Sequence, residues 1–217
     1  MPEFSSILFD LDGTIVDSAP GITATLAYTF EQLGLPIPTP AELVAYVGPP
    51  ILDSFRDLAG FSPEESQQAL GIYRTHYLET GVFNATVYDG VPEVLRAIGE
   101  SPIPLSLATS KPEAPATLIL EHFSLASSFD IITGASADEV RSAKADVVEE
   151  AIKRLTAIGA DVSNPVMVGD RSHDVHGAAA HGIPTIFVEW GYGSPAEQAG
   201  TVASVKTAAE LQKLLLG

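Results

Sequence analysis

SSILFDLDGTIVDS, residues 5–18, joins a strongly apolar run to a group of carboxylates. Residues 7–9 have the composition of a strand that is buried on both faces. Asp10 and Asp12 follow at once, and because they are two residues apart in an extended chain, their side chains point the same way. Two carboxylates held this close repel each other unless a cation or a proton lies between them. The stretch therefore predicts a buried strand that ends in a charged site.

The composition limits both the size of the fold and the kind of partner. The 217 residues suffice for one large domain or for a domain with an insertion, and the 46% hydrophobic content allows a sizeable core. Acidic residues outnumber basic ones 28 to 11, and the resulting net charge of −17 repels nucleic acids and anionic membranes. We therefore expect neither a nucleic-acid nor a membrane partner, and an anionic substrate needs a local cation.

The sequence contains no cysteine, which excludes disulfides, thiolate catalysis and cysteine-based zinc sites. No apolar run approaches the roughly 18 residues that span a bilayer. Residues 1–10 lack the basic segment followed by an apolar segment that marks a secretory signal. We expect a soluble cytoplasmic protein that is a monomer or a homodimer.

Short apolar runs recur along the chain, and helical patterns lie between the later ones. After the first run, they cover 103–110, 129–135, 164–170 and 183–190. The helical patterns cover 112–123, 142–158 and 174–181. Buried strands that alternate with helices are typical of a parallel sheet. We therefore predict an α/β fold, a Rossmann-like open parallel sheet with helices on both faces.

One region breaks this alternation. From about residue 18 to residue 84 the sequence shows helical patterns separated by Pro and Gly, and no convincing strand. The predicted helices lie near 22–33, 41–47, 50–59 and 63–80. We therefore predict an inserted all-α domain at 17–84, within a discontinuous catalytic core formed by 1–16 and 85–217. Linkers near 15–18 and 82–88 are expected to flex when the inserted domain closes over the core.

Polar side chains follow three of the predicted strands. They are Asp10, Asp12, Gly13 and Thr14 after the first, Thr109, Ser110 and Lys111 after the second, and Asp170, Arg171 and Asp174 after the fourth. Ligands bind at the carboxyl ends of the strands in open parallel sheets, so we expect these residues to converge. Four carboxylates at one edge form an all-oxygen set that suits Mg²⁺.

The same residues suit chemistry on a phosphate group. A carboxylate can attack phosphorus as a nucleophile, and a second one can protonate the leaving oxygen, roles for which Asp10 and Asp12 have the right mutual position. Gly13 lets backbone N–H groups approach an anion, and Ser110 precedes a predicted helix N-terminus, where anions are favoured. Lys144 begins the 142–158 helix and can direct a positive charge at phosphate.

Four motifs together resemble a known family. DLDGTIVDS (10–18), ATSKPE (108–113), Lys144 and VGDRSHDVHGA (168–178) match in order and spacing the haloacid dehalogenase superfamily. The match is to the phosphoglycolate-phosphatase-like group with a helical (C1-type) cap after the first strand, and it covers nearly the whole chain. The resemblance implies the α/β core and cap described above, with Mg²⁺ as cofactor.

The resemblance also implies roles for single residues. Asp10 is expected as the nucleophile and Asp12 as the general acid and base. Asp10, the Asp12 carbonyl oxygen and Asp170 are expected to bind Mg²⁺, supported by Asp174. The transferring phosphoryl group is expected to be held by Thr109 and Lys144, with backbone donors near Gly13 and Ser110.

Substrate choice is expected to rest on the cap loop YVGPPILDSF (46–55). Its candidate substrate contacts are Gly48, Pro49, Pro50 and the nearby Arg56. Dehalogenase and phosphonatase members lack an Asp at the position of Asp12, which indicates a phosphatase or a phosphomutase. Sugar-phosphate mutases carry basic residues in this loop, whereas residues 47–50 here carry no charge, which favours hydrolysis of a small phosphate monoester.

Several alternatives stay open at this stage. The substrate is expected to be phosphoglycolate-like or a nucleotide or sugar phosphate. A sugar-phosphate mutase and a non-enzymatic receiver-type phospho-acceptor domain are the other two functions that fit these motifs. Asp17 is interpreted as part of a helix N-terminus, and Lys111 as either a surface residue or a substrate contact. His173, His176 and His181 are expected to be hydrated surface residues, and GYG (191–193) a turn after the last strand.

Overall fold

The computed structural model describes residues 4–217, so residues 1–3 of the predicted core lie outside the described part. The strands are β1 (Ser6–Phe9), β2 (Val16–Asp17), β3 (Thr86–Val87), β4 (Leu105–Pro112), β5 (Ile131–Ala135), β6 (Pro165–Gly169), β7 (Thr185–Val188) and β8 (Ala203–Val205). Helices of the first half are α1 (Ala19–Gln32), α2 (Pro40–Val44), α3 (Ile51–Asp57), α4 (Pro63–His76) and the π-helix η1 (Tyr77–Gly81). They are followed by α5 (Val91–Gly99), α6 (Glu113–His122), α7 (Lys144–Ala157), α8 (Ser172–Ala179), α9 (Ala208–Leu216) and the short 3₁₀ turns η2 (Ala126–Ser128) and η3 (Pro195–Gln198).

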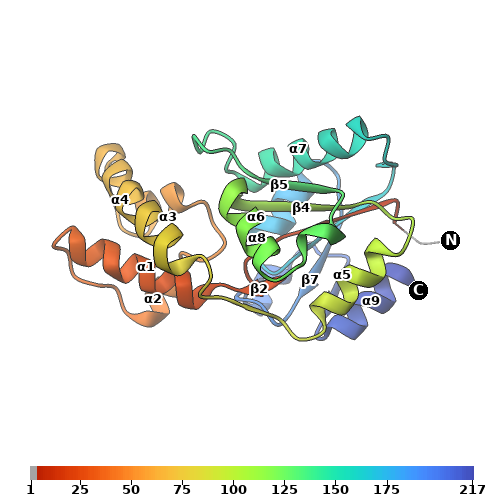
Figure 1. Ribbon diagram of the computed structural model, residues 1–217, viewed down its shortest axis with the longest axis horizontal. Helices are drawn as coiled ribbons and strands as arrows, with labels where there is room; N and C mark the ends of the chain where they lie inside the picture. Colours follow the sequence, from red (N-terminus) through yellow and green to blue (C-terminus); the bar gives the residue numbers. More distant parts are fainter. Residues whose placement is uncertain (1–3) are drawn as a thin grey trace.

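Within the described residues, the main sheet has six strands in the order β5-β4-β1-β6-β7-β8, and every neighbouring pair is parallel. β1 lies between β4 and β6 at the centre of the sheet, and all four of its residues are buried. Ile7 and Phe9 belong to the core cluster shared with α5, α6 and α9, whereas Leu8 packs with residues of α7 and α8 on the other face. The predicted parallel α/β sheet with helices on both faces is confirmed (Figure 1).

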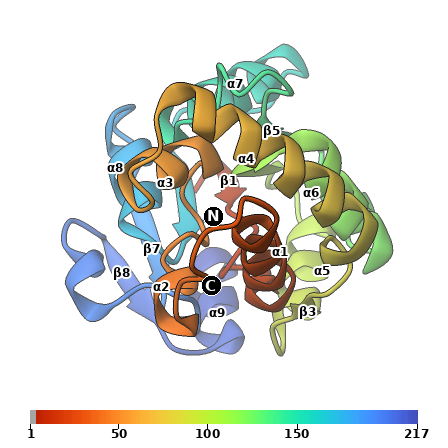
Figure 2. The same cartoon turned by 90° about the vertical axis from the view of Figure 1, so that its left-hand side faces the viewer.

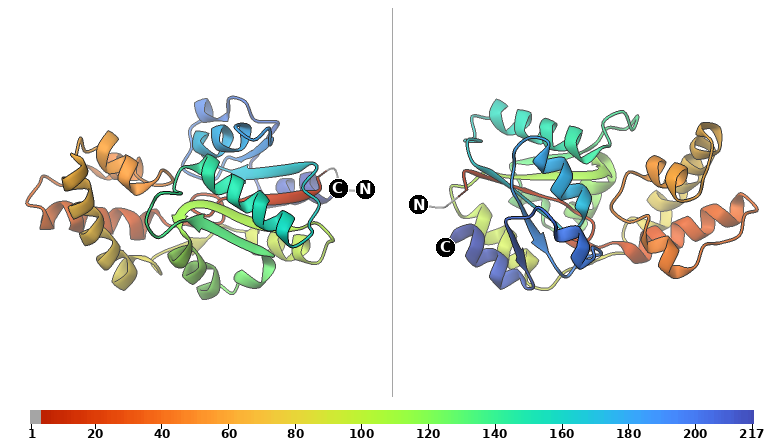
Figure 3. Two further views of the ribbon diagram at one scale, coloured as in Figure 1. Left: turned by 90° about the horizontal axis from the view of Figure 1, so that it is seen from above. Right: turned by 180° about the vertical axis from the view of Figure 1, so that it is seen from behind.

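The helices α1 to α4 and η1 form a separate unit, which we call the helical layer (residues 19–81). It lies beyond the end of the sheet opposite to the two chain termini, as Figures 1 and 3 show. Figure 2 looks onto this layer, with α1, α3 and α4 in front of the sheet. The antiparallel pair β2 and β3 connects the layer to the core. The predicted domain boundaries fall in or beside these two strands, and the division itself stays a prediction.

Local sequence signals explain where the helices of the layer begin. Thr39 and Ser62 each accept a hydrogen bond from the backbone N–H three residues later, and Glu42 and Glu65 bond back to the backbone of the cap residue. This reciprocal arrangement satisfies donors that a helix end otherwise leaves free. Inside the layer, aromatic rings pack against one another and fix its shape. They belong to Phe30, Tyr46, Phe55, Phe61, Tyr73 and Tyr77.

Two parts of the fold were not predicted. The last strand of the sheet is β8 and not the 183–190 segment, and at three residues β8 is too short to show a periodic pattern. β2 and β3, with two residues each, escape detection for the same reason. In the described residues, no helix is long and apolar enough to cross a membrane.

Candidate active site

The polar residues predicted at the strand ends meet at the edge of the sheet that faces the helical layer. Because β1 pairs with both β4 and β6, the residues that follow these three strands are neighbours in space. Carboxylate oxygens of Asp10, Asp170 and Asp174 all lie within 4.8 Å of one another, and all three residues are buried. The prediction that these carboxylates converge is therefore matched by the geometry.

Lys144 lies between two of these carboxylates. Its Nζ is 2.7 Å from Asp10 Oδ1 and 2.8 Å from Asp174 Oδ1, and it also donates to the Ala108 carbonyl at 3.1 Å. The lysine begins α7 and reaches the site past Gly177 of α8, where an added Cβ would lie 2.5 Å from Lys144 Cγ. Burial opposes the charge of Lys144, but the two carboxylates raise the pKa of its ammonium above the usual value. Lys144 is therefore a fixed cation.

The first loop and the GYG segment together enclose Asp170. Its Oδ1 accepts a hydrogen bond from Thr14 Oγ1 at 3.1 Å, and its Oδ2 accepts one from the Tyr192 backbone N–H at 2.7 Å. Gly13, with φ of +86°, and Gly191 both approach this carboxylate so closely that a Cβ on either would lie 2.3 Å from Asp170 Oδ2. GYG was interpreted as a turn after the last strand. That interpretation was incomplete, because this segment positions a central carboxylate.

Asp174 lies beside these carboxylates and accepts both of its hydrogen bonds on a single oxygen. Oδ2 accepts the backbone N–H groups of Asp170 and Arg171 at 3.1 and 3.0 Å, while Oδ1 faces Lys144. Asp10 and Asp170 are both strongly desolvated. Burial raises the pKa of Asp10 to about 6 against the opposing effect of Lys144. Burial and the charges of Asp174 and Asp10 raise the pKa of Asp170 as well.

The donor set fits a divalent cation. Asp10, Asp12, Asp170 and Asp174 contribute four negative charges in a buried region, while Lys111 and Lys144 contribute two positive ones. Buried carboxylates are stable in their charged form only when paired or bound to a metal. Asp10 and Asp170 offer hard oxygen ligands of the kind that Mg²⁺ prefers, so the residues present fit the predicted metal.

The carboxylate of Asp12 is turned away from this cluster. Ser18 Oγ donates to Asp12 Oδ1 at 2.5 Å, and Lys111 Nζ lies 3.2 and 3.1 Å from its two oxygens. Lys111 is buried, and its ammonium also lies 4.7 Å from the centre of the Tyr77 ring. The surface interpretation of Lys111 is therefore wrong, and the residue holds the side chain of Asp12 in place.

The end of β4 supplies hydroxyl groups. The register of β4 with β5 shifts between Ala108 and Pro112, and irregularities of this kind redirect side chains next to active sites. Thr109 Oγ1 accepts the Lys111 backbone N–H at 3.2 Å. Ser110 is buried, and its hydroxyl has no hydrogen-bond partner among the described residues. A buried hydroxyl without a partner is expected to bind a ligand or water.

Asp17 takes part in the N-terminus of α1, as interpreted from the sequence, and it does so together with Tyr192. Asp17 belongs to β2, and its Oδ1 accepts both the Ala19 N–H at 3.2 Å and the Tyr192 hydroxyl at 2.7 Å. The Tyr192 oxygen accepts the backbone N–H groups of Ser18 and Ala19 at 2.8 and 3.0 Å. Tyr192 thus takes part in capping α1, which leaves the Ser18 hydroxyl free for Asp12.

The candidate contacts in the loop 46–55 divide into two groups. Gly48 and Pro49 line a cavity between the helical layer and the sheet, together with Asp12, Ser110 and other residues. Pro50 is the residue before α3 and does not line this cavity. Arg56 is exposed and pairs with Asp53 and Asp57, so its assignment as a substrate contact is not supported. The three predicted surface histidines are exposed.

Two arginines make polar contacts between the helical layer and the core. Arg171, next to Asp170, donates from its Nη1 to the Val47 carbonyl at 2.6 Å. Arg74 of α4 pairs with Glu139 of the loop 136–143 at 2.6 Å and donates to the Ala137 carbonyl at 3.1 Å. Glu139 has a φ of 62°, which is uncommon for a residue other than glycine. These contacts describe a layer that is closed over the cavity.

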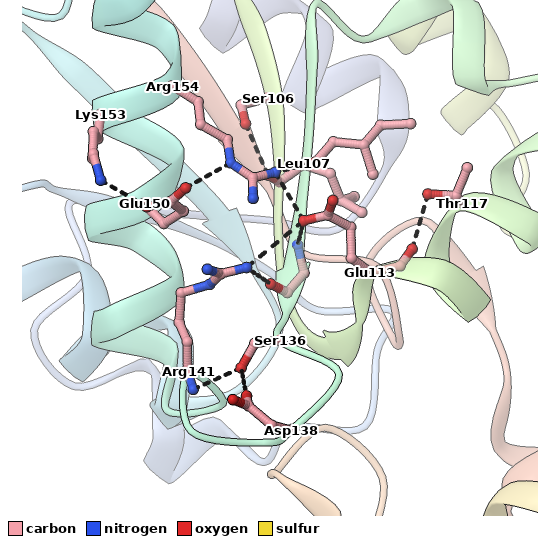
Figure 4. A network of polar contacts seen from close by, with 12 residues as sticks. Ser106, Leu107, Glu113, Thr117, Ser136, Asp138, Arg141, Glu150, Lys153 and Arg154 are labelled. Carbon is pink, nitrogen blue, oxygen red and sulfur yellow. Dashed lines mark hydrogen bonds and ion pairs between the residues drawn. The ribbon is translucent and has the colours of Figure 1, made fainter.

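A polar network supports the loop 136–143 from the side of the core, as Figure 4 shows. At its centre, Glu113 accepts hydrogen bonds from Arg154 at 2.8 Å and from the Gly134 N–H at 3.3 Å. Arg141 of the loop donates to the Gly134 carbonyl at 3.2 Å. The loop that carries Glu139 is thus tied to α6 and α7.

Sequence reasoning missed the supporting residues Ser18, Tyr192, Arg74 and Glu139. Tyr192, Arg74 and Glu139 act through contacts with residues that are distant in sequence. Ser18 acts through its hydroxyl, and the local sequence does not show which group that hydroxyl contacts. The sequence held one signal, for Ser18. This residue belongs to the first motif, and the helix that follows it has a proline in its first turn, where one backbone N–H is already missing and needs no cap.

Comparison with known proteins gives a consistent result. The family described as haloacid dehalogenase-like hydrolase matches residues 7–188. The tyrosine-protein kinase PtkA of Mycobacterium tuberculosis (strain ATCC 25618 / H37Rv) is 40% identical over 187 residues, which are 86% of this chain but 62% of that protein. A 5'-nucleotidase of Pseudomonas aeruginosa is 36% identical over 194 residues, covering 89% of this chain and 86% of that protein. The chain therefore spans less than two thirds of PtkA.

Solved structures share the whole fold. A predicted phosphatase from Clostridium acetobutylicum is 36% identical, with a TM-score of 0.91 and coverage of 98% of both chains. The structure of PtkA is 37% identical, with a TM-score of 0.82, and the match covers 99% of this chain and 100% of that one. Both matches include the helical layer as well as the sheet.

Proposed function

This chain belongs to the haloacid dehalogenase-like hydrolase family, and we propose that it is a Mg²⁺-dependent phosphatase of small phosphate monoesters that works through an aspartyl-phosphate. The observation that carries the proposal is the division of labour between two neighbouring carboxylates. Asp10 lies in the buried cluster with Lys144, while Asp12 is held away from it by Ser18 and Lys111. The two groups thus meet a phosphate from different sides.

In the first step, an Asp10 oxygen attacks phosphorus and the bond from phosphorus to the leaving oxygen breaks. Protonated Asp12 gives its proton to that oxygen, so that an alcohol leaves and the phosphoryl group stays on Asp10. Lys144 holds the Asp10 carboxylate in place, because it is bonded on its other side to Asp174 and to the Ala108 carbonyl. Ser110 and Thr109 offer hydroxyls to the phosphoryl oxygens.

In the second step, the Asp12 carboxylate takes a proton from a water molecule, which attacks phosphorus and breaks its bond to Asp10. Inorganic phosphate leaves, Asp10 is again a carboxylate, and Asp12 is again protonated for the next cycle. The contact with Lys111 keeps the Asp12 carboxylate in position for this second step.

Mg²⁺ would be held by Asp10, Asp170 and the main-chain carbonyl of Asp12, and when bound it would neutralise the charge that the carboxylates and the phosphate bring together. Asp174 accepts two backbone N–H groups on Oδ2 and has Lys144 beside Oδ1, so we assign it to orienting Lys144 and the backbone around Asp170. The cluster of Asp10, Asp170 and Asp174 supports this assignment.

We treat residues 17–84 as a cap that excludes water during the reaction. The contacts of Arg171 with Val47 and of Arg74 with Glu139 support closure over the cavity. A mutase would have to grip a second phosphate, yet Arg74 and Lys111, the cations that line the cavity, are both paired with carboxylates. A receiver-type domain is set aside because family membership extends over residues 7–188.

The proposal is tested with p-nitrophenyl phosphate and Mg²⁺. We expect turnover that EDTA abolishes and that Asp10→Asn lowers by at least roughly 10⁴-fold, because the nucleophile is lost. Asp161→Asn removes an exposed carboxylate in the same way and serves as the matched control, which should leave the rate unchanged. After rapid quenching, mass spectrometry should find one phosphoryl group on the peptide that contains Asp10. Full activity of Asp10→Asn would refute the mechanism.

The name of the mycobacterial relative suggests a second candidate, the transfer of a phosphoryl group to a tyrosine. The two candidates differ in the acceptor, since a phosphatase releases inorganic phosphate and a kinase phosphorylates a peptide. Incubation with ATP, Mg²⁺ and a tyrosine-containing peptide, followed by mass spectrometry of the peptide, separates them. We expect no phosphopeptide to form.

A further inference from the structure

The cavity between the helical layer and the sheet lies on the side of the site where the leaving group departs. It is bordered by Asp12, Ser110 and Lys111, and Asp10 does not line it. In the proposed mechanism Asp12 protonates the leaving oxygen and must therefore lie within hydrogen-bond reach of it. The walls of this cavity thus contact the part of the substrate that is released as an alcohol.

The wall opposite the catalytic residues is apolar and largely aromatic. It is formed by side chains of the helical layer: Ile22, Tyr46, Pro49, Ile51, Tyr73 and Tyr77. The Tyr73 and Tyr77 rings are stacked, with centroids 5.5 Å apart and planes at 7°. Tyr46 and Tyr73 each pack edge-on against Phe55, which is fully buried. The wall is therefore rigid before a ligand binds, which lowers the entropy cost of binding.

The charged groups of the cavity are already committed to one another. Among the described lining residues they are Asp12, Lys111, Arg74 and Glu139, which form two ion pairs at 3.1 and 2.6 Å. A carboxylate or a second phosphate on the leaving group would meet two acidic side chains and no free cation.

The size of the cavity limits the ligand further. Its volume of about 220 Å³ lies below the roughly 300–1,000 Å³ that is usual for drug-sized ligands. One ring with a short linker fits this space better than a nucleoside. Aromatic rings pack favourably on one another in stacked or edge-on geometry, and flat tyrosine rings favour a flat ligand.

From these observations we infer that the preferred substrates are small aryl or arylmethyl phosphates with an uncharged leaving group. The single ring of this leaving group lies against the wall that contains Tyr46, Tyr73 and Tyr77. This inference rests on the phosphatase function proposed above. It departs from the phosphoglycolate, nucleotide and sugar substrates that the sequence suggests, because none of these carries a compact apolar leaving group.

The test compares kcat/KM for benzyl phosphate, cyclohexylmethyl phosphate and phosphoglycolate, all of which release an unactivated primary alcohol. We expect benzyl phosphate to exceed phosphoglycolate by about 100-fold, because the carboxylate of phosphoglycolate stays unpaired. Benzyl phosphate should exceed cyclohexylmethyl phosphate by about 3- to 10-fold, the share that ring packing contributes. Equal rates for all three, or a preference for phosphoglycolate, would overturn the inference.

A pair of variants tests whether the cavity wall is responsible. Leu78 lines the cavity and is 50% exposed, so Leu78→Lys adds a cation at its mouth without disturbing the core. Leu58 is 51% exposed, lies outside this cavity, and provides Leu58→Lys as the control. We expect Leu78→Lys to shift the ratio of phosphoglycolate to benzyl phosphate upward by about 10-fold, and Leu58→Lys to leave it unchanged.

The outcomes distinguish the two proposals. If p-nitrophenyl phosphate is not hydrolysed, the proposed function itself has failed. If p-nitrophenyl phosphate is hydrolysed but the three alkyl phosphates show no preference, or if the two lysine variants behave alike, the inference about the leaving group has failed and the phosphatase function stands.

Discussion

The edge of the sheet and the helical layer face the same cavity, but they are built in opposite ways. At the edge, charged groups are buried and linked: Lys144 contacts both Asp10 and Asp174, and it lowers the pKa of Asp10 against the effect of burial. The wall of the layer is made of tyrosine rings and aliphatic side chains that pack without such coupling. The edge is suited to chemistry on phosphate, which every substrate shares, and the wall to discrimination between leaving groups.

This contrast predicts different consequences of mutation. Removal of one buried charge at the edge leaves its partners uncompensated and affects stability, metal binding and catalysis together. A change in the wall alters contacts with one part of the substrate and leaves the charged network intact. The predictions below test this contrast, beginning with the largest expected effect.

The largest effect is expected for Lys144→Met. The substitution removes the cation between Asp10 and Asp174, and breaking a buried ion pair from one side costs about 3–5 kcal/mol. We expect the unfolding free energy in EDTA to fall by this amount and saturating Mg²⁺ to restore part of it, because the metal binds only the folded site. The rate should fall by about 10³-fold, the scale seen when one group that stabilises developing charge is lost.

Lys153 on the same helix provides the control for this experiment. Its side chain is 77% exposed and its partner Glu150 lies 3.6 Å away, so Lys153→Met should leave both the unfolding free energy and the rate almost unchanged. Denaturant unfolding with and without Mg²⁺ measures the effect. Equal stability of the Lys144→Met and wild-type proteins in EDTA would show that the carboxylates at the edge are not coupled through this lysine.

The carboxylates at the edge of the sheet could be predicted from the sequence because each of them lies shortly after a strand. The meeting of Asp10, Asp170 and Asp174 at one edge could be predicted once the apolar runs were interpreted as parallel strands, since parallel strands bring their carboxyl ends together. The wall could not be predicted in this way. Tyr46 and Tyr73 look like ordinary core residues of helices, and their placement over the cavity depends on how the layer docks on the sheet.

The same limit explains the individual errors. Lys111 gave no local sign of burial, because its partner Asp12 is 99 residues away in sequence. Arg56 was a candidate substrate contact, but its guanidinium forms ion pairs with the nearby Asp53 and Asp57. GYG (191–193) positions Asp170 through the Tyr192 backbone N–H, a long-range contact that the local sequence does not indicate. Sequence patterns thus predict which groups share an edge, whereas long-range pairing decides which of them stay free.

The second prediction concerns the pH dependence of stability without metal. The pKa of Asp10 is about 6 in the folded protein and is taken as the usual 3.8 in the unfolded chain, so the folded protein binds this proton more tightly. This carboxyl therefore destabilises the fold as pH rises from about 4 to above 6, by on the order of 2–3 kcal/mol. In EDTA, we expect the difference in melting temperature between Asp10→Asn and the wild type to grow over this range.

The comparison with Asp10→Asn isolates this group from the general repulsion in a chain of net charge −17, which changes with pH in both proteins. Saturating Mg²⁺ should reverse the trend for the wild type, because protons then compete with the metal for the carboxylates. Parallel pH profiles of the two proteins in EDTA would contradict the proposed protonation of Asp10.

The smallest effect is expected at the contact between layer and core. Glu139 is 3% exposed in its side chain and Arg74 is 37% exposed, so solvent partly screens this pair. We expect Glu139→Gln to destabilise the closed arrangement by about 1 kcal/mol, which corresponds to roughly a fivefold change in its population. Hydrogen exchange should then become faster in the linker strands β2 and β3, while the main sheet stays protected. KM should rise by a similar factor, with little change in kcat.

The pair of Arg56 with Asp53 and Asp57 offers the matched control, because it lies within the helical layer and both partners are exposed. Arg56→Gln should change neither the exchange of the linkers nor KM. If Glu139→Gln behaves like Arg56→Gln, the ion pair of Arg74 and Glu139 does not hold the layer closed, and the contrast between a charged edge and an apolar wall extends to closure as well. If instead only Glu139→Gln opens the linkers, charge controls access to the site while the wall selects what enters it.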